Sequence, residues 1–412
     1  QAELEAFIKA QPQARDLSFA VGVIANLESG EILAAPEVNH RYADAPSSVL
    51  RSVNVGSAIK PLLAAATLVS FPELATLQIR NPGGRVSELW GYQLSSDFET
   101  GARCAPGWID LRRFLECSSN VYAASLVSAG LQPRTNGRLA LEHRSGAAFR
   151  LSARDESGRQ PRLPLEPDLT IHPESLFASV LSHGLDELFG ITTSLEEASI
   201  AHGDSTVWEG LTDAAGNPVR VPSGLWPDRA RVGLAYQGRR STLRRLAAVA
   251  IGAGEARLTP IDLTQAFGPL VSDRTLVLRF VPADTAATPW SDHGLRSQRW
   301  YPTFMAGLRG VGETGTAAGT GAIVRRVLGS NVVFFGKTGT LNAPASSLRR
   351  SRDTVVRVDP VVATTLVFAV GNAPGSAGAP LSCGFVGTIY FRLNREVDRV
   401  GPLATGVGDQ GL

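Results

Sequence analysis

Residues 58–69, AIKPLLAAATLV, form a nearly uninterrupted run of apolar and helix-favouring residues, and Ser57 stands directly before it. A helix that is apolar on all sides belongs in the interior of a protein, so this run predicts a buried central helix. Serine is favoured at helix N-termini, which places Ser57 at or beside the helix start. Positions three apart share one helical face, so the Lys60 amine is expected beside the Ser57 hydroxyl. A candidate nucleophile and a candidate base therefore share a single turn.

Lysine is rare in this chain, since only Lys9, Lys60 and Lys337 occur among its 40 Lys and Arg residues. A guanidinium group stays charged in proteins, whereas burial and a neighbouring cation can leave a lysine amine neutral. Apart from Lys9 near the terminus, the lysines thus stand where an amine could act as a base. Taken alone, Ser57 is better explained as a plain helix cap, and Lys60 as a solvated helix lysine.

Two short stretches further along the chain carry similar groups. Ser118-Ser119-Asn120 interrupts a predicted helix at 109–127, and Lys337-Thr338-Gly339-Thr340 follows a predicted strand at 332–335. Each has a plain structural explanation by itself, as a polar break between helices and as a turn. The combination S-x-x-K, S-x-N and K-T-G is expected by chance in roughly one chain in a hundred of this composition. The combination is therefore a stronger signal than any of its parts.

In this order the three motifs resemble those of the penicillin-binding transpeptidase and serine β-lactamase superfamily. Other segments resemble the transpeptidase branch in particular, and the resemblance runs from about Phe19 to about Val397. These segments are the strand-turn-strand at 25–34, the glycine-rich turn at 251–254 with the Thr-Pro helix start at 258–263, and residues 315–318 before the K-T-G strand.

The resemblance implies a role for each motif residue. Ser57 would attack an amide carbonyl and form an acyl-enzyme, with a neutral Lys60 as its base. Ser118 would relay a proton to the leaving amine, and Asn120 would hold the substrate amide. Lys337 would add positive potential that favours a neutral Lys60 and attracts a substrate carboxylate.

The remaining K-T-G residues are expected to bind substrate. The hydroxyls of Thr338 and Thr340 would bind the substrate carboxylate, and Gly339 would let the substrate backbone approach the strand. By the same resemblance, the backbone N–H groups of Ser57 and Thr340 would form an oxyanion hole.

Predicted strands at both ends with helices between them indicate an α+β fold, an antiparallel sheet flanked by helices with a helical subdomain. The resemblance implies the same β-lactamase/transpeptidase-like architecture. The expected organisation is a linker at 1–17, a transpeptidase domain at 18–400 with an insertion at 131–170, and a flexible tail at 401–412. Further helices are predicted at 173–190, 194–201, 242–250, 260–270 and 381–400, and a further strand at 361–370.

Composition narrows the function classes. A net charge of +2 gives no reason to expect a nucleic-acid partner, and the six histidines do not cluster with acidic residues or cysteines, so neither a metal nor another cofactor is expected. Three cysteines, Cys104, Cys117 and Cys383, permit at most one internal disulfide, and we interpret them as small buried apolar residues. The chain begins with Gln, so a membrane anchor or a glycosyltransferase domain upstream is compatible with it.

The kind of acyl transfer can also be narrowed. No G-x-S-x-G pentapeptide occurs, which sets a Ser-His-Asp hydrolase aside. The resemblance implies that a hydrolysing β-lactamase would carry Glu-x-x-x-Asn between the second and third motifs, as in class A, or Tyr-x-Asn, as in class C. Neither pattern occurs, so fast hydrolysis of the acyl-enzyme is not expected. The resemblance then implies an extracytoplasmic D,D-transpeptidase that acts on D-Ala-D-Ala-ended peptidoglycan stem peptides and binds β-lactam antibiotics. A penicillin-binding sensor or non-catalytic cell-wall binder, a D,D-carboxypeptidase and a weak β-lactamase are the alternatives. The 131–170 and 341–357 segments depart from the family pattern and bear on the substrate.

Overall fold

A computed structural model gives the structure of the 412-residue chain. The part of the chain that it describes comprises residues 2, 5–6, 17–39, 49, 53–81, 88–89, 92–93, 107–130, 134–135, 138–139, 144–145, 148–152, 206–212, 218–221, 250–252, 257–274, 276–279, 294–343, 346–349, 355–358, 361–372 and 379–394.

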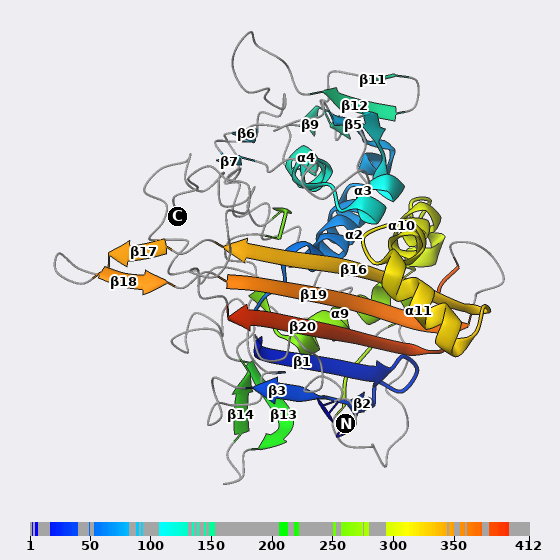
Figure 1. Ribbon diagram of the computed structural model, residues 1–412. Helices are drawn as coiled ribbons and strands as arrows, with labels where there is room; N and C mark the ends of the chain where they lie inside the picture. The colour runs from blue at the N-terminus through cyan, green and yellow to red at the C-terminus, as the bar shows by residue number, and fades with distance from the viewer. Residues whose placement is uncertain are drawn as a thin grey trace.

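One antiparallel sheet joins the two ends of the sequence (Figure 1). Its strand order is β16-β19-β20-β1-β2, and β3 also pairs with β1. The strands are β1 (Leu17–Asn26), β2 (Ile32–Ala34), β3 (Glu37–Asn39), β16 (Val332–Ala343), β19 (Val361–Asn372) and β20 (Phe385–Asn394). The pairing of β1 with β20 brings together strands that lie near opposite ends of the sequence. This sheet and its helices confirm the predicted α+β class.

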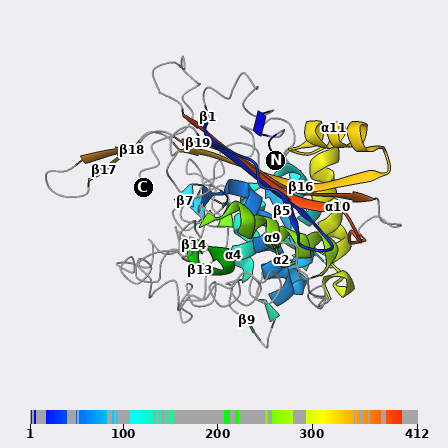
Figure 2. The same cartoon turned by 90° about the horizontal axis from the view of Figure 1, so that it is seen from below.

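Helices cover both faces of the sheet. Figures 1 and 2 place α11 on one face and α2 and α9 on the other. The α-helices are α2 (Lys60–Ser70), α3 (Leu111–Cys117), α4 (Asn120–Gly130), α9 (Pro260–Ser272), α10 (Tyr301–Glu313) and α11 (Ala318–Leu328). Short 3-10 helices are η3 (Gly56–Ile59), η4 (Pro72–Thr76) and η5 (Leu295–Ser297). No helix among the described residues is long and apolar enough to cross a membrane.

Smaller sheets surround this core. The sheet of order β11-β12-β5-β8 contains β5 (Gln78–Asn81), β8 (Gly107–Ile109), β11 (Arg144–Ser145) and β12 (Ala148–Ser152). Two-stranded pairs are β4 (Val53–Asn54) with β15 (Arg257–Leu258), β6 (Glu88–Leu89) with β7 (Tyr92–Gln93), β9 (Arg134–Thr135) with β10 (Arg138–Leu139), β13 (Thr206–Thr212) with β14 (Pro218–Val221), and β17 (Ser346–Arg349) with β18 (Val355–Val358).

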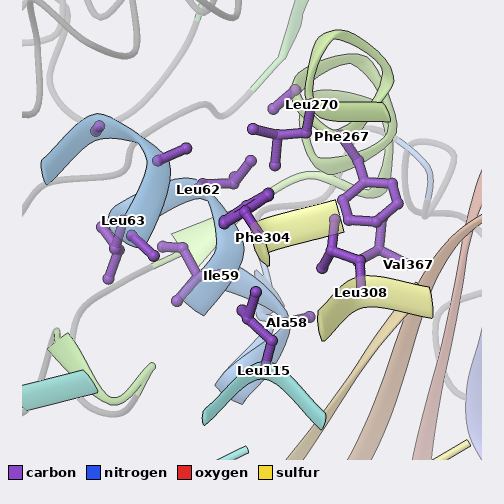
Figure 3. Packing of buried hydrophobic residues seen from close by; sticks show 14 of the residues in the cluster. Ala58, Ile59, Leu62, Leu63, Leu115, Phe267, Leu270, Phe304, Leu308 and Val367 are labelled. Atoms are coloured by element: carbon purple, nitrogen blue, oxygen red, sulfur yellow. The ribbon is translucent and has the colours of Figure 1, made fainter. Parts of the chain in front are cut away.

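The predicted central helix is confirmed as α2, which is buried from Lys60 to Leu68. Figure 3 shows Leu62 of this helix near Phe304 of α10, with Phe267 of α9 and Val367 of β19 in the same cluster. Burial of a large apolar side chain contributes about 1.5–3 kcal/mol, so a helix surrounded on all sides is held far more firmly than its propensity alone would hold it. The residues at its start are consequently held in fixed positions.

The predicted helix at 381–400 is wrong, because its described part forms the strand β20. Val386, Thr388 and Tyr390 are buried, and they alternate with less buried or smaller neighbours. A period of two is typical of a strand, and β-branched and aromatic residues favour it. Pairing with β1 and β19 on both sides then places this segment inside the sheet.

Helix α10 has no counterpart in the sequence prediction. It contains Gly307, Gly310 and Gly312, and each glycine weakens an isolated helix by about 1 kcal/mol. A Cβ atom on Gly307 would lie 2.9 Å from Leu115 Cβ, and one on Gly310 would overlap with the Glu116 side chain. The glycines therefore allow α10 to approach α3 closely, and this packing stabilises a helix that local propensity disfavours.

The interpretation of the cysteines as small apolar residues needs correction. Cys117 is buried and takes part in a disulfide bond, whereas Cys383 is a partly buried free thiol. A disulfide requires its two Cα atoms within about 7 Å, which the spacing of three cysteines along a sequence does not reveal.

Some of the other predicted elements are confirmed, and the rest lie wholly or largely outside the described residues. The helix at 260–270 is confirmed as α9, and the strands at 332–335 and 361–370 are confirmed within β16 and β19. Helices at 173–190 and 194–201, the tail at 401–412 and nearly all of the helix at 242–250 and of the linker at 1–17 lie outside the described residues. Strands β9 to β12 fall within the predicted insertion at 131–170, and β17 and β18 follow the K-T-G strand.

A pH-dependent prediction concerns the start of α9. Thr259 and Asp262 form a capping box, in which Thr259 N donates to Asp262 Oδ2 at 3.2 Å and Asp262 N donates to Thr259 Oγ1 at 3.0 Å. Burial raises the pKa of Asp262 from 3.8 to about 6, although hydrogen bonding of its carboxyl to the side chain and backbone of Thr259 acts to lower it. A carboxyl that binds its proton more tightly in the folded chain lowers stability at neutral pH, and this cost disappears as the pH falls through 6 toward 4.

We expect Asp262→Asn to raise the free energy of unfolding at pH 8 by about 1–2 kcal/mol and to have little effect near pH 4. The amide oxygen of Asn can still accept from Thr259 N, so the cap is retained. Urea unfolding at both pH values measures the difference. A variant less stable than the wild type at pH 8 would contradict this expectation.

Candidate active site

Ser57 lies in η3, the single 3-10 turn that leads directly into α2. The residues preceding η3 and α2 are Val55 and Ile59, and neither helix start has a side-chain cap. The interpretation of Ser57 as a helix cap is therefore excluded. Its side chain is partly exposed, in contrast to the buried residues on either side of it.

Two glycines let neighbouring segments close on the peptide that carries Ser57. Gly252 has φ +81°, and a Cβ on it would overlap with Gly56 O and lie 2.9 Å from Ser57 N. A Cβ on Gly339 of β16 would overlap with Val55 O and lie 3.2 Å from Ser57 N. From the sequence, Gly339 was expected to let the substrate backbone approach the strand. In the structure its near neighbour is the Ser57 turn itself, which explains why this strand position lacks a side chain.

Lys60, the first residue of α2, is only 1% exposed. Its Nζ donates to Asn120 Oδ1 at 2.6 Å, to the Ser118 carbonyl oxygen at 2.7 Å and to Ser118 Oγ at 3.4 Å. The amine is thus held between the central helix and the turn that connects α3 to α4. The interpretation of Lys60 as a solvated lysine is excluded by its burial.

The connection between α3 and α4 aims polar atoms at Lys60. Ser118 ends α3 with φ 65° and ψ 37°, a left-handed conformation that few residues other than glycine adopt. Ser119 is fully buried, and its Oγ accepts a hydrogen bond from Tyr122 N at 3.1 Å at the start of α4. Ser118 changes the direction of the chain after α3, and the hydrogen bond to Ser119 Oγ caps the start of α4. As a result, the hydroxyl and carbonyl of Ser118 and the amide of Asn120 face one lysine.

Lys337 approaches the same serine from the sheet. It lies on the edge strand β16, is fully buried, and its Nζ donates to Ser118 Oγ at 2.6 Å and to Thr338 O at 2.8 Å. Burial and the positive charge of Lys60 hold the pKa of Lys337 well below its usual value. Two buried amines therefore share one hydroxyl oxygen, and their mutual repulsion favours a state in which one of them is neutral.

The two threonines of the K-T-G stretch lie on the other face of β16. Residues two apart in a strand share a face, so Thr338 and Thr340 lie opposite Lys337 and Gly339. Thr338 is partly buried and its Oγ1 lies 2.6 Å from Thr316 Oγ1, in the turn between α10 and α11. Thr340 is exposed.

The structure brings together predicted residues that lie far apart in the sequence. Lys60, Ser118, Asn120 and Lys337 form one hydrogen-bonded cluster. Ser57 lies three residues before Lys60, in the 3-10 turn that leads into α2. The role of each residue stays a prediction. Among the described residues, no three His, Cys, Asp or Glu side chains gather as metal ligands would.

Two residues at this site, Gly252 and Thr316, were not predicted from the sequence. Both stand in segments that resemble the transpeptidase pattern, at 251–254 and 315–318, but neither was given a role. Local sequence holds no signal for them, because their importance depends on contacts with the Ser57 turn and with Thr338, which lie nearly 200 and about 20 residues away.

The fold places the chain in a known structural class. The chain has the fold of penicillin-binding-protein transpeptidase domains. Among solved structures, it is similar to the transpeptidase domain of penicillin-binding protein 3 from Burkholderia pseudomallei, with a TM-score of 0.54 and 14% identity over 96% of this chain and 87% of that one.

It is also similar to a structure named as a peptidoglycan glycosyltransferase from Burkholderia ambifaria, with a TM-score of 0.52 and 12% identity over 95% of this chain and 86% of that one. No family model and no curated protein matches the sequence. At these identities the likeness to the two solved structures concerns the fold alone.

Proposed function

We propose that the chain is a serine D,D-transpeptidase that acts on D-Ala-D-Ala-ended peptidoglycan stem peptides, with Ser57 as the nucleophile, and that β-lactams acylate the same serine. The observation that carries this proposal is the shared position of the Ser118 hydroxyl, 2.6 Å from Lys337 Nζ and 3.4 Å from Lys60 Nζ. A hydroxyl between two buried amines can pass a proton between the nucleophile side and the leaving-group side of a reaction centre.

The proposed reaction has two balanced steps. In the first, Ser57 Oγ forms a bond with the amide carbonyl carbon, and its proton passes to the neutral Lys60 amine. The amide C–N bond then breaks, and the leaving amine of D-Ala takes a proton through Ser118. In the second step an acceptor amine attacks the ester, gives up a proton by the reverse route and releases Ser57. Asn120 would orient the substrate amide, and the N–H groups of Ser57 and Thr340 would bind the oxyanion.

We further propose that residues 18–400 form one transpeptidase domain and that it works outside the cytoplasm. The disulfide at Cys117 supports this localisation, because disulfides persist mainly in oxidising compartments. An upstream membrane anchor or glycosyltransferase domain is compatible with it. The sensor or cell-wall binder, the D,D-carboxypeptidase and the weak β-lactamase differ from the proposal in the fate of the acyl group, which an experiment can follow.

The test is covalent labelling with benzylpenicillin followed by intact-protein and peptide mass spectrometry. We expect a stable adduct of one penicilloyl group on Ser57, and none in Ser57→Ala. The control Ser29→Ala changes an exposed turn serine and should label like the wild type. Incubation with a D-Ala-D-Ala stem peptide and an acceptor amine should then give a cross-linked product.

Each other result identifies an alternative. Release of D-Ala with water as the acceptor indicates a carboxypeptidase, and rapid loss of the penicilloyl adduct indicates a β-lactamase. A stable adduct without turnover of the peptide indicates a sensor. An unlabelled wild type, or labelling at a different residue, refutes the role of Ser57.

A further inference from the structure

Asn54 ends the short strand β4, three residues before Ser57, and its side chain holds the turn that carries the candidate nucleophile. Its Oδ1 accepts a hydrogen bond from Gly56 N at 2.9 Å. This contact between an Asn side chain and the backbone two residues on is an Asx turn. Gly56 has φ +56°, in the left-handed region, and glycine can adopt several other conformations about as easily. The side chain of Asn54 therefore selects one orientation of Gly56.

The backbone of Asn54 is itself anchored in the interior. Asn54 pairs with Arg257 of β15, and Val53 pairs with Leu258. Val53 and Leu258 are both buried, and β15 is followed directly by the capped start of α9. Asn54 thus connects a fixed part of the core to the Ser57 turn.

The backbone at Gly56 is closely surrounded on the side of the proposed oxyanion hole. A Cβ on Gly56 would lie 3.0 Å from Thr340 N and 3.1 Å from Thr340 O. A Cβ on Gly252 would overlap with Gly56 O and lie 2.9 Å from Ser57 N. Gly56 therefore lies next to both N–H groups of the proposed oxyanion hole, those of Ser57 and Thr340. A change in its orientation would move the Ser57 N–H and the Ser57 hydroxyl relative to Thr340.

We infer that Asn54 is a positioning residue for acyl transfer, whose side-chain oxygen holds Gly56 so that the N–H and the hydroxyl of Ser57 meet the same substrate carbonyl. This inference rests on the proposed acyl transfer at Ser57. Asn54 acts through Gly56 and not by contact with the substrate. An oxyanion donor is effective only at about 2.7–3.1 Å from the developing oxyanion, so a turn with several orientations of Gly56 would react more slowly.

The test is the rate of penicilloyl adduct formation on Ser57 of the intact protein with benzylpenicillin, together with the fraction of protein labelled at completion. We expect Asn54→Ala to lower the second-order rate about tenfold to a hundredfold, because reacting groups misplaced by about 1 Å lose rate to this extent. Every variant should still label to completion, since a positioning role changes the rate and not the number of working sites.

Two conservative variants test whether the hydrogen bond is the cause. Asn54→Asp keeps an acceptor oxygen that forms the same kind of turn, so it should retain the wild-type rate within about threefold. Asn54→Ser offers a weaker acceptor and should react at an intermediate rate. Asn54→Ser also keeps the comparison available if Asn54→Ala does not fold.

Asn26→Ala is the matched control, because it removes an Asx turn of the same kind at the end of β1. Asn26 is partly exposed, as Asn54 is, and its Oδ1 accepts from Glu28 N at 2.7 Å and from Ser29 N at 3.0 Å. Loss of this turn should lower the thermal stability of the protein and leave the acylation rate unchanged.

Three results would overturn the inference while labelling of the wild type upholds the proposed function. The first is an unchanged rate in Asn54→Ala, or in Asn54→Ser if only that variant folds. The second is a rate in Asn54→Asp as low as in Asn54→Ala, and the third is a smaller labelled fraction that forms at the wild-type rate. Absence of any adduct on wild-type Ser57 overturns both the inference and the proposed function.

Discussion

Lys60→Met is expected to lower the rate of Ser57 acylation by at least about 10³-fold while the protein stays folded. Removal of a positioned general base costs about 10²–10⁴ in rate, and the Lys60 donor also holds Ser118 and Asn120 in place. Methionine is unbranched and similar in length to the lysine stem, so it can occupy this buried position without a large cavity. The measurement is the second-order rate of penicillin acylation, with circular dichroism as the test of folding.

Two further variants sharpen this result. Lys60→Arg keeps a positive charge but cannot supply a neutral amine, so it should be as inactive as Lys60→Met. Lys9→Met alters the lysine near the terminus and should acylate normally. If Lys60→Met kept a tenth of the wild-type rate, Lys60 would not be the base.

Lys337→Met is expected to lose acylation by about 10²–10³-fold and yet to unfold no more easily than the wild type at pH 7.5. Burial and the Lys60 charge lower the pKa of Lys337, so the folded chain binds this proton less tightly than the unfolded chain does. Between the lowered pKa and about 10.5, the unfolded state carries more protons, and stability therefore rises with pH. Below this window Lys337 lowers the stability of the fold. Methionine removes that cost.

The corresponding measurement is the free energy of unfolding between pH 7 and pH 10. The wild type should gain stability over this range, and Lys337→Met should show a flatter profile with an equal or higher value at pH 7.5. A variant that is inactive, less stable at pH 7.5 and unchanged in slope would show that Lys337 stabilises the fold, and the coupling of the two lysines would then be wrong. A gain in stability with lost activity is the pattern expected of a residue placed for chemistry.

The parts of the fold that were predictable have a strong local pattern. The apolar run of α2, the strand of β16 and the Thr-Pro start of α9 each combine a hydrophobic period with a recognisable boundary. Helix α10 and strand β20 were not predictable in this way. The glycines of α10 lower its helix propensity, so its sequence does not indicate a helix. Strand β20 was predicted as a helix because an apolar segment of that length fits both the helical and the strand period until its neighbours in the sheet are known.

The features of the candidate site also divide into those that the sequence predicts and those that it does not. The sequence alone determines the types of the site residues and their order along the chain. It also predicts that Ser57 and Lys60 lie close together, since residues three apart in a helix have a fixed separation. The sequence also shows that two of the sites carry lysine in a chain that otherwise mostly uses arginine.

Only the tertiary structure decides that Lys60 and Lys337 meet at one hydroxyl, that Thr316 contacts Thr338 and that Cys117 forms a disulfide. These contacts join segments up to 219 residues apart. Local preferences carry no information over such distances, because the approach depends on how the sheet and the helices pack around α2.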